Sequence, residues 1–88
     1  MQVNPVTRLK SGLLVREVDG EILILDAERD QVHQLNASAS LIWQHYDSGA
    51  EIEEIAKTLA IKFDLDEDKA QRDVRAALED FRRLELIR

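Results

Sequence analysis

The residues of this chain that could do chemistry are few and poorly grouped. His33 and His45 are the only imidazoles, and neither stands in a spacing such as HExxH that would bring two ligands onto one metal ion. The chain contains no cysteine, which excludes a thiol nucleophile, a zinc finger and an iron–sulfur cluster. Gly12, Gly20 and Gly49 are too far apart in the chain to form a phosphate-binding loop. We therefore expect neither a metal site nor a nucleotide site.

Carboxylates are abundant, but they are grouped where helices are expected to begin. An acid–base pair needs a cleft that shifts its pKa values, and 88 residues seldom build such a cleft around a substrate. Asp64, Asp66 and Asp68 have the alternate spacing of a calcium-binding loop, but Lys69 occupies the position that requires glycine. We expect no catalysis by this chain and no cofactor.

The charge balance opposes two classes of partner. Twelve basic and eighteen acidic residues give a net charge of −6, and acidic residues outnumber basic ones in both halves of the chain. Such a surface gains little from a polyanion such as duplex DNA or an anionic membrane. The longest aliphatic run, Ile22 to Leu25, is far too short for a membrane-spanning helix, and residues 1–12 contain no signal-peptide stretch. We expect a cytoplasmic protein without nucleic-acid or membrane partners.

The first half of the chain predicts a small antiparallel sheet. Residues 1–12 lack periodicity and are interpreted as an N-terminal arm, and residues 13–88 as a single domain. Asp19-Gly20 supplies the positive φ angles of a type I′ hairpin turn. The aliphatic run from Ile22 does not alternate, which is typical of a strand covered on both faces. The sheet is predicted as a three-stranded meander with the second strand in the middle, from Leu13–Val18, Glu21–Asp26 and Gln31–Leu35.

The second half predicts three helices. Asn36 and Asp66 stand where their side chains can cap the first and third helices. Residues 85–88 form a short apolar tail that is expected to lie on the core. The helices are predicted over Ala37–Tyr46, Glu51–Lys62 and Asp66–Arg83, which gives an α+β fold of a meander followed by three helices.

The third strand suggests a binding function. Its sequence, Gln31-Val32-His33-Gln34-Leu35, lies at a sheet edge and carries neither the lysine nor the proline that usually blocks such edges. A peptide could pair with it as an additional strand. Two alternatives remain. In a winged-helix DNA-binding protein the third helix would read the groove, although its first turn, Asp66-Glu67-Asp68, would repel phosphate. In a structural homodimer the same edge would pair with its twin.

A family resemblance adds to this reading. The stretch from Leu35 to Ile87 resembles the PqqD family: Leu-Asn followed by small residues and Ile-Trp, a turn with glycine, a helix containing Glu-Ile-Ala, a spacer with phenylalanine, and an Asp-Val helix with an apolar tail. With the three strands, the similarity covers Leu13 to Arg88. The combination of motifs is fairly specific, although each alone is weak. One departure is Glu85, which stands where the family frequently has glycine.

The resemblance implies a function. PqqD-like proteins are small winged-helix-like peptide chaperones, also called RiPP precursor recognition elements, which bind the leader of a ribosomally made precursor peptide and present it to a modifying enzyme. In pyrroloquinoline quinone biosynthesis that enzyme is a radical SAM protein. For this chain the resemblance implies that the strand Gln31, Val32, His33, Gln34 and Leu35 gains the peptide as a neighbour. It also implies that the third helix forms the groove wall around Asp73 to Asp80.

Helical geometry narrows the groove wall. Four positions, Ala70, Val74, Ala77 and Phe81, centre the apolar stripe of the third helix, with Ala77 small enough to leave a depression. One border of the stripe holds Asp73, Ala76 and Asp80, and the other holds Gln71, Arg75 and Arg82. We favour the first border, because a small alanine between two acids leaves room for an apolar anchor and offers partners to a basic residue.

Overall fold

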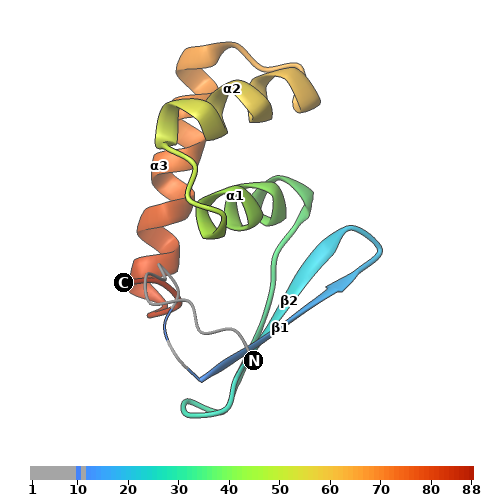
Figure 1. The fold of residues 1–88 in the computed structure, drawn as a ribbon, viewed down its shortest axis with the longest axis vertical. Helices are drawn as coiled ribbons and strands as arrows, with labels where there is room; N and C mark the ends of the chain where they lie inside the picture. Colours follow the sequence, from blue (N-terminus) through green and yellow to red (C-terminus); the bar gives the residue numbers. More distant parts are fainter. Residues whose placement is uncertain (1–9, 11) are drawn as a thin grey trace.

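The fold is a three-stranded antiparallel sheet followed by three helices, which confirms the predicted α+β class. The computed structural model describes residue 10 and residues 12–88, so the predicted arm lies almost entirely outside the described residues. Figure 1 shows α3 along one side of the molecule, extending past α2 and α1 to the level of the sheet. The elements are β1 (Leu13–Val18), β2 (Glu21–Asp26), β3 (Gln31–Gln34), α1 (Ala37–Asp47), α2 (Ile52–Phe63) and α3 (Glu67–Arg83).

The sheet has the order β1-β2-β3, and among residues 12–88 the helices pack against one of its faces. Asp19 and Gly20 adopt φ angles of 53° and 81°, as the predicted hairpin turn requires. Ile22 and Ile24 are buried, whereas Leu23 and Leu25 are only half-buried. The expectation that β2 would be covered on both faces is therefore wrong. The aliphatic run reflects an apolar outer face rather than a second covering layer.

Helix α1 connects the sheet to the other two helices. It contacts β2 on one side and α2 and α3 on the other (Figure 1). Trp43 on α1 is 2% exposed and meets the ring of Phe81 on α3 edge to face, with centroids 5.2 Å apart. Such contacts add to the energy of burial. The core thus forms around α1, with β2, α2 and α3 arranged about it.

The helix boundaries follow local chemistry. The Asn36 side chain accepts a hydrogen bond from the backbone of Ala39 at 2.9 Å, and Asp66 accepts one from Lys69 at 2.8 Å, so both predicted caps are confirmed. Helix α2 ends at Asp64, which adopts a left-handed conformation with φ of 56°. Asparagine and aspartate tolerate that conformation better than most residues, so the chain can turn sharply into α3.

A buried serine joins the sheet to α1. Ser40 is 1% exposed. Its hydroxyl accepts a hydrogen bond from the backbone N–H of Ile22 at 2.8 Å and donates one to the carbonyl of Leu35 at 3.1 Å. Ile22 lies at the start of β2 and Leu35 directly follows β3. One side chain therefore satisfies backbone groups of two strands while it sits in the first turn of α1.

The tail after α3 lies on the core, as predicted. Leu86 and Ile87 are buried in the core. Glu85 adopts φ of 60°, a conformation that glycine takes without steric cost, which accounts for the glycine frequent at this position in the family it resembles. Arg29, between β2 and β3, donates to Glu85 at 2.7 Å and to the buried Asp26 at 3.4 Å. The tail is thereby tied to the connection that precedes β3.

We predict that Ser40→Ala destabilises the protein by about 1–3 kcal/mol, because it leaves the buried N–H of Ile22 and the carbonyl of Leu35 without their partner. Urea denaturation measures the change in the free energy of unfolding. Ser48→Ala is the matched control, since the Ser48 hydroxyl is exposed and bonds carbonyls at the end of α1. Equal stability of the two variants would contradict the role given to Ser40.

Candidate functional site

In the part of the chain that the structure describes, no strand pairs with the outer edge of β3. Leu35 donates its N–H to Ile22 of β2 at 2.8 Å. Because residues of an antiparallel pair alternate in the direction of their hydrogen bonds, His33 also directs its backbone groups to β2. Val32 and Gln34 direct theirs away from it. Residues Val32 and Gln34 therefore offer the N–H and C=O groups to which an added strand could bind.

The structure narrows the edge predicted from sequence. Gln31, Val32, His33 and Gln34 lie in β3, but Leu35 follows the strand and is only 7% exposed. Its N–H is already bonded to Ile22 and its carbonyl to Ser40. The prediction that Leu35 belongs to the binding edge is therefore corrected. This residue is part of the core, and its backbone bonds hold the end of β3 against β2 and α1.

Strand β3 and helix α3 are not in direct backbone contact. No Cα atom of β3 lies within 8 Å of one of α3, whereas a strand pairs with its neighbour at about 4.8 Å. The two elements are nevertheless linked near both ends of β3. The Arg29–Glu85 ion pair joins the connection before β3 to the tail after α3, and Asn36 lies beside α3 after the strand. The α3 helix therefore runs alongside β3 in the opposite direction.

A hollow of about 260 Å³ lies where α3 meets the start of α1. It brings together all four residues predicted on α3, and it shows that the border carrying the acids, rather than the border with Arg75, faces α1. Ala76 is exposed and Ala77 half-buried, so the floor is made of small side chains. The lining residues are Asn36, Ser38, Ala39, Ile42, Asp73, Ala76, Ala77 and Asp80. We call this surface, together with the open edge of β3, the β3–α3 groove.

The two acids of the groove have partners on their own helix. The Asp73 carboxylate lies 3.5 Å from the ammonium of Lys69, and Asp80 is paired with Arg83. All four side chains are largely exposed in these pairs, and exposed ion pairs contribute only about 0–1 kcal/mol. Either acid can therefore exchange its partner for a basic residue of a ligand at little cost.

His33 has a feature that its sequence position did not indicate. The side chain is half-buried, and because His33 is paired with the buried Ile24 it faces the helical side of the sheet. Its Nε2 atom is enclosed and has no hydrogen-bond partner among the described residues. Such a group is costly to leave unpaired. His33 thus places its Nε2 atom, which can still form a hydrogen bond, on the helical side of β3.

Sequence reasoning missed the part of the groove contributed by α1. Ala39 and Ile42 line the hollow, although no residue of the first helix was predicted to belong to the site. The available signal was the run of small residues that follows Asn36, since small side chains allow another element to approach closely.

Among residues 10 and 12–88, no cluster of three or more His, Cys, Asp or Glu side chains could hold a metal ion. No helix in the same part of the chain is long and apolar enough to cross a membrane.

A family comparison agrees with this architecture. The sequence profile of the family described as "Coenzyme PQQ synthesis protein D (PqqD)" matches residues 21–87, which include β2, β3, all three helices and the tail. The chain belongs to the PqqD family. A comparison with curated proteins found no match.

Two solved structures share the fold of this PqqD family member over nearly its whole length. One is "Lasso peptide synthetase B1 complexed with the leader peptide", with 25% identity, a TM-score of 0.84, and coverage of 90% of this chain and 93% of that chain. The other is "TbiB1 in Complex with the TbiA(beta) Leader Peptide", with 24% identity, a TM-score of 0.83, and coverage of 91% and 93%. Both similar proteins were solved with a leader peptide bound.

The hydrogen-bond alternation of β3 predicts different effects of proline at adjacent positions. His33→Pro removes a backbone donor that points to β2 and should lower the free energy of unfolding by about 1–3 kcal/mol. Val32→Pro removes a donor that points to the open edge, where proline is tolerated, and should cost less than about 1 kcal/mol. Urea denaturation of both variants measures the difference. Greater destabilisation by Val32→Pro would reverse our assignment of the open edge.

Proposed function

We propose that this chain is a peptide chaperone that binds the leader part of a ribosomally made precursor peptide and presents it to a separate modifying enzyme. The observation that carries the proposal is the outer edge of β3, which no strand of the described residues pairs and which has no Cα atom within 8 Å of α3. Membership of the PqqD family and similarity to two proteins solved with leader peptides support it. The leader lies in the β3–α3 groove as the fourth strand of the sheet.

The proposed binding combines backbone hydrogen bonds with side-chain contacts. Backbone groups of the leader pair with Val32 and Gln34, which positions the peptide without regard to its sequence. An apolar side chain of the leader enters the hollow beside Ala76 and Ala77, and a neighbouring basic residue pairs with Asp73 or Asp80. These side-chain contacts provide the specificity. The proposed binding residues are therefore Gln31, Val32, His33, Gln34, Asp73, Ala76, Ala77 and Asp80.

The chain supplies no catalytic group in this proposal. Chemistry on the precursor belongs to the partner enzyme, a radical SAM protein or another peptide-modifying enzyme. The name of the family refers to PQQ synthesis, and one of the similar structures is a lasso peptide synthetase with a leader peptide. A leader-bearing precursor is the substrate class that fits both. The chain would meet such a precursor in the cytoplasm, where the ribosome releases it.

The central test is a substitution in the hollow. Ala76→Arg fills the space intended for the apolar anchor and should weaken leader binding by about 1–3 kcal/mol, as loss of a buried anchor would. Folding should be spared because Ala76 is exposed. Calorimetric titration with a synthetic leader peptide that the parent chain binds measures the effect. Arg75→Glu, on the opposite border of α3, is the matched control and should bind nearly as the parent does. If Arg75→Glu were the weaker binder, the groove would lie on the other side of α3.

The same titration tests the backbone hydrogen bonds between the leader and β3. Val32→Pro removes one N–H from the open edge, and a lost hydrogen bond of this kind costs about 0.5–1.5 kcal/mol or more when its partner is left unpaired. We therefore expect Val32→Pro to bind the precursor several-fold more weakly than the parent. Unchanged affinity in a folded Val32→Pro variant would exclude strand addition at this edge.

Nucleic acid provides the discriminating control between function classes. At about 150 mM salt we expect no micromolar binding to duplex DNA, because a chain of net charge −6 gains nothing from counterion release. The first turn of α3 also carries Glu67 and Asp68, where a recognition helix would approach phosphate. Fluorescence anisotropy with random duplexes measures this. Salt-sensitive micromolar binding would favour the winged-helix DNA-binding alternative.

A further inference from the structure

The outer face of the sheet carries an aliphatic row that ends at the open edge. Leu14 is paired with Leu25, and Leu25 with Val32, so the three side chains lie beside one another across β1, β2 and β3. Leu14 is 49% exposed, Val32 is 63% exposed, and Leu25 between them is half-buried. Val32 thus has an apolar neighbour on one side only. Its other side faces the position that an added strand would occupy.

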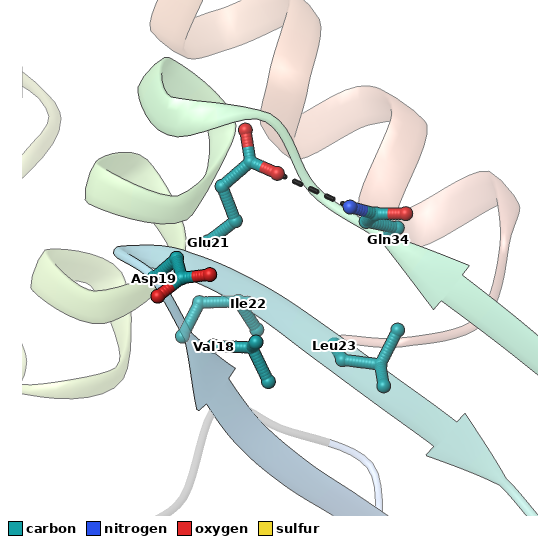
Figure 2. Close-up of a pocket in the computed structure, with 6 residues that line it drawn as sticks. All are labelled: Val18, Asp19, Glu21, Ile22, Leu23 and Gln34. Atoms are coloured by element: carbon teal, nitrogen blue, oxygen red, sulfur yellow. Dashed lines mark hydrogen bonds between the residues drawn. The ribbon is translucent and has the colours of Figure 1, made fainter.

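The next outward-facing row has a different character. It consists of Arg16, Leu23 and Gln34, paired in that order. The Gln34 side chain donates a hydrogen bond to the Glu21 carboxylate at 3.1 Å (Figure 2). Both residues line an open hollow of about 280 Å³ near the β1–β2 turn. At the open edge this row therefore ends in a polar group held in place by an acid.

We propose that Val32 is a specificity-determining residue, which selects an aliphatic or aromatic leader side chain on the outer face of the sheet. This inference rests on the proposed function. In an antiparallel addition, the leader residue directly opposite Val32 exchanges both backbone hydrogen bonds with it and points to the same face. That residue becomes the fourth member of the row begun by Leu14 and Leu25. Removing its apolar surface from water, together with that of Val32, favours binding.

The register also fixes the neighbouring preferences. An antiparallel leader runs from the Gln34 end of β3 toward the Gln31 end. The leader residue opposite Gln34 therefore comes two positions before the leader residue opposite Val32. That earlier residue lies beside the hydrogen-bonded pair of Gln34 and Glu21. The leader residue between these two positions faces the helical side of the sheet. The selected leader pattern is thus a polar or basic residue, an inward-facing residue, and an aliphatic or aromatic residue, in that order.

The test is selection from a library of random peptides displayed on phage, with the full chain as bait. We expect the parent chain to enrich aliphatic and aromatic residues about two- to five-fold at one position of the aligned peptides. Val32→Glu should replace that preference by Lys and Arg at the same position and leave the other positions unchanged. Leu14→Glu is the matched control: it lies in the same row at the far edge, and its selected peptides should equal those of the parent.

The outcomes separate this inference from the proposed function. If peptides are enriched and Ala76→Arg abolishes their capture, but Val32→Glu selects the same residues as the parent, the leader binds the groove and Val32 has no selective role. If Leu14→Glu shifts the preference as Val32→Glu does, selection comes from the face as a whole and the assignment to Val32 is overturned. If the parent enriches no peptide, the proposed function fails and this inference fails with it.

Discussion

The hydroxyl of Ser40 is the constraint on which the arrangement of this protein depends. It lies between the start of β2 and the residue after β3, and it belongs to the first turn of α1. Its bonds therefore fix where the sheet ends, where α1 begins, and how the two are oriented. Because α1 in turn contacts both α2 and α3, the position of α3 relative to β3 follows from the same link. The binding geometry is thus set by a residue that does not line the groove.

A second link completes the groove from its other end. Arg29 joins Asp26 at the end of β2 to Glu85 after α3, while the apolar residues of the tail are buried beneath. An exposed ion pair alone contributes little stability, but this one is supported by the burial of Leu86 and Ile87. With α1 at one end and the tail at the other, these contacts fix the position of α3 relative to β3.

Much of this structure could be predicted from local patterns. The Asp19-Gly20 turn, the caps at Asn36 and Asp66, and the apolar stripe of α3 each depend on residues within a few positions of one another, and the structure confirms them. The acidic border of α3, favoured from sequence as the peptide-binding side, lines a hollow with α1, and its role in peptide binding stays a prediction.

The features that could not be predicted depend on long-range contacts or on the exact strand end. Ser40 and Ile22 are 18 positions apart in the sequence, and Arg29 and Glu85 are 56 positions apart. No local sequence pattern therefore predicts either hydrogen bond. Leu35 was assigned to the strand because it ends the run that begins at Gln31, but it is buried in the core, where its carbonyl accepts a hydrogen bond from Ser40. The aliphatic run of β2 suggested two covered faces, because apolar residues on an open face cannot be distinguished by sequence from those under a second layer.

The shortness of β3 has a consequence for how long a complex would last. Only Val32 and Gln34 direct backbone groups outward, so strand addition supplies about four hydrogen bonds, each worth a net ~0.5–1.5 kcal/mol. Association costs at least about 4 kcal/mol in lost translational and rotational freedom, so side-chain anchors must supply the net affinity. A dissociation constant of about 1 μM corresponds to a net binding free energy of about 8 kcal/mol. With an association rate of about 10⁶ M⁻¹s⁻¹, a micromolar complex lives for about a second. That lifetime is comparable to the turnover time of many enzymes, which suits a carrier that must release its cargo after each round.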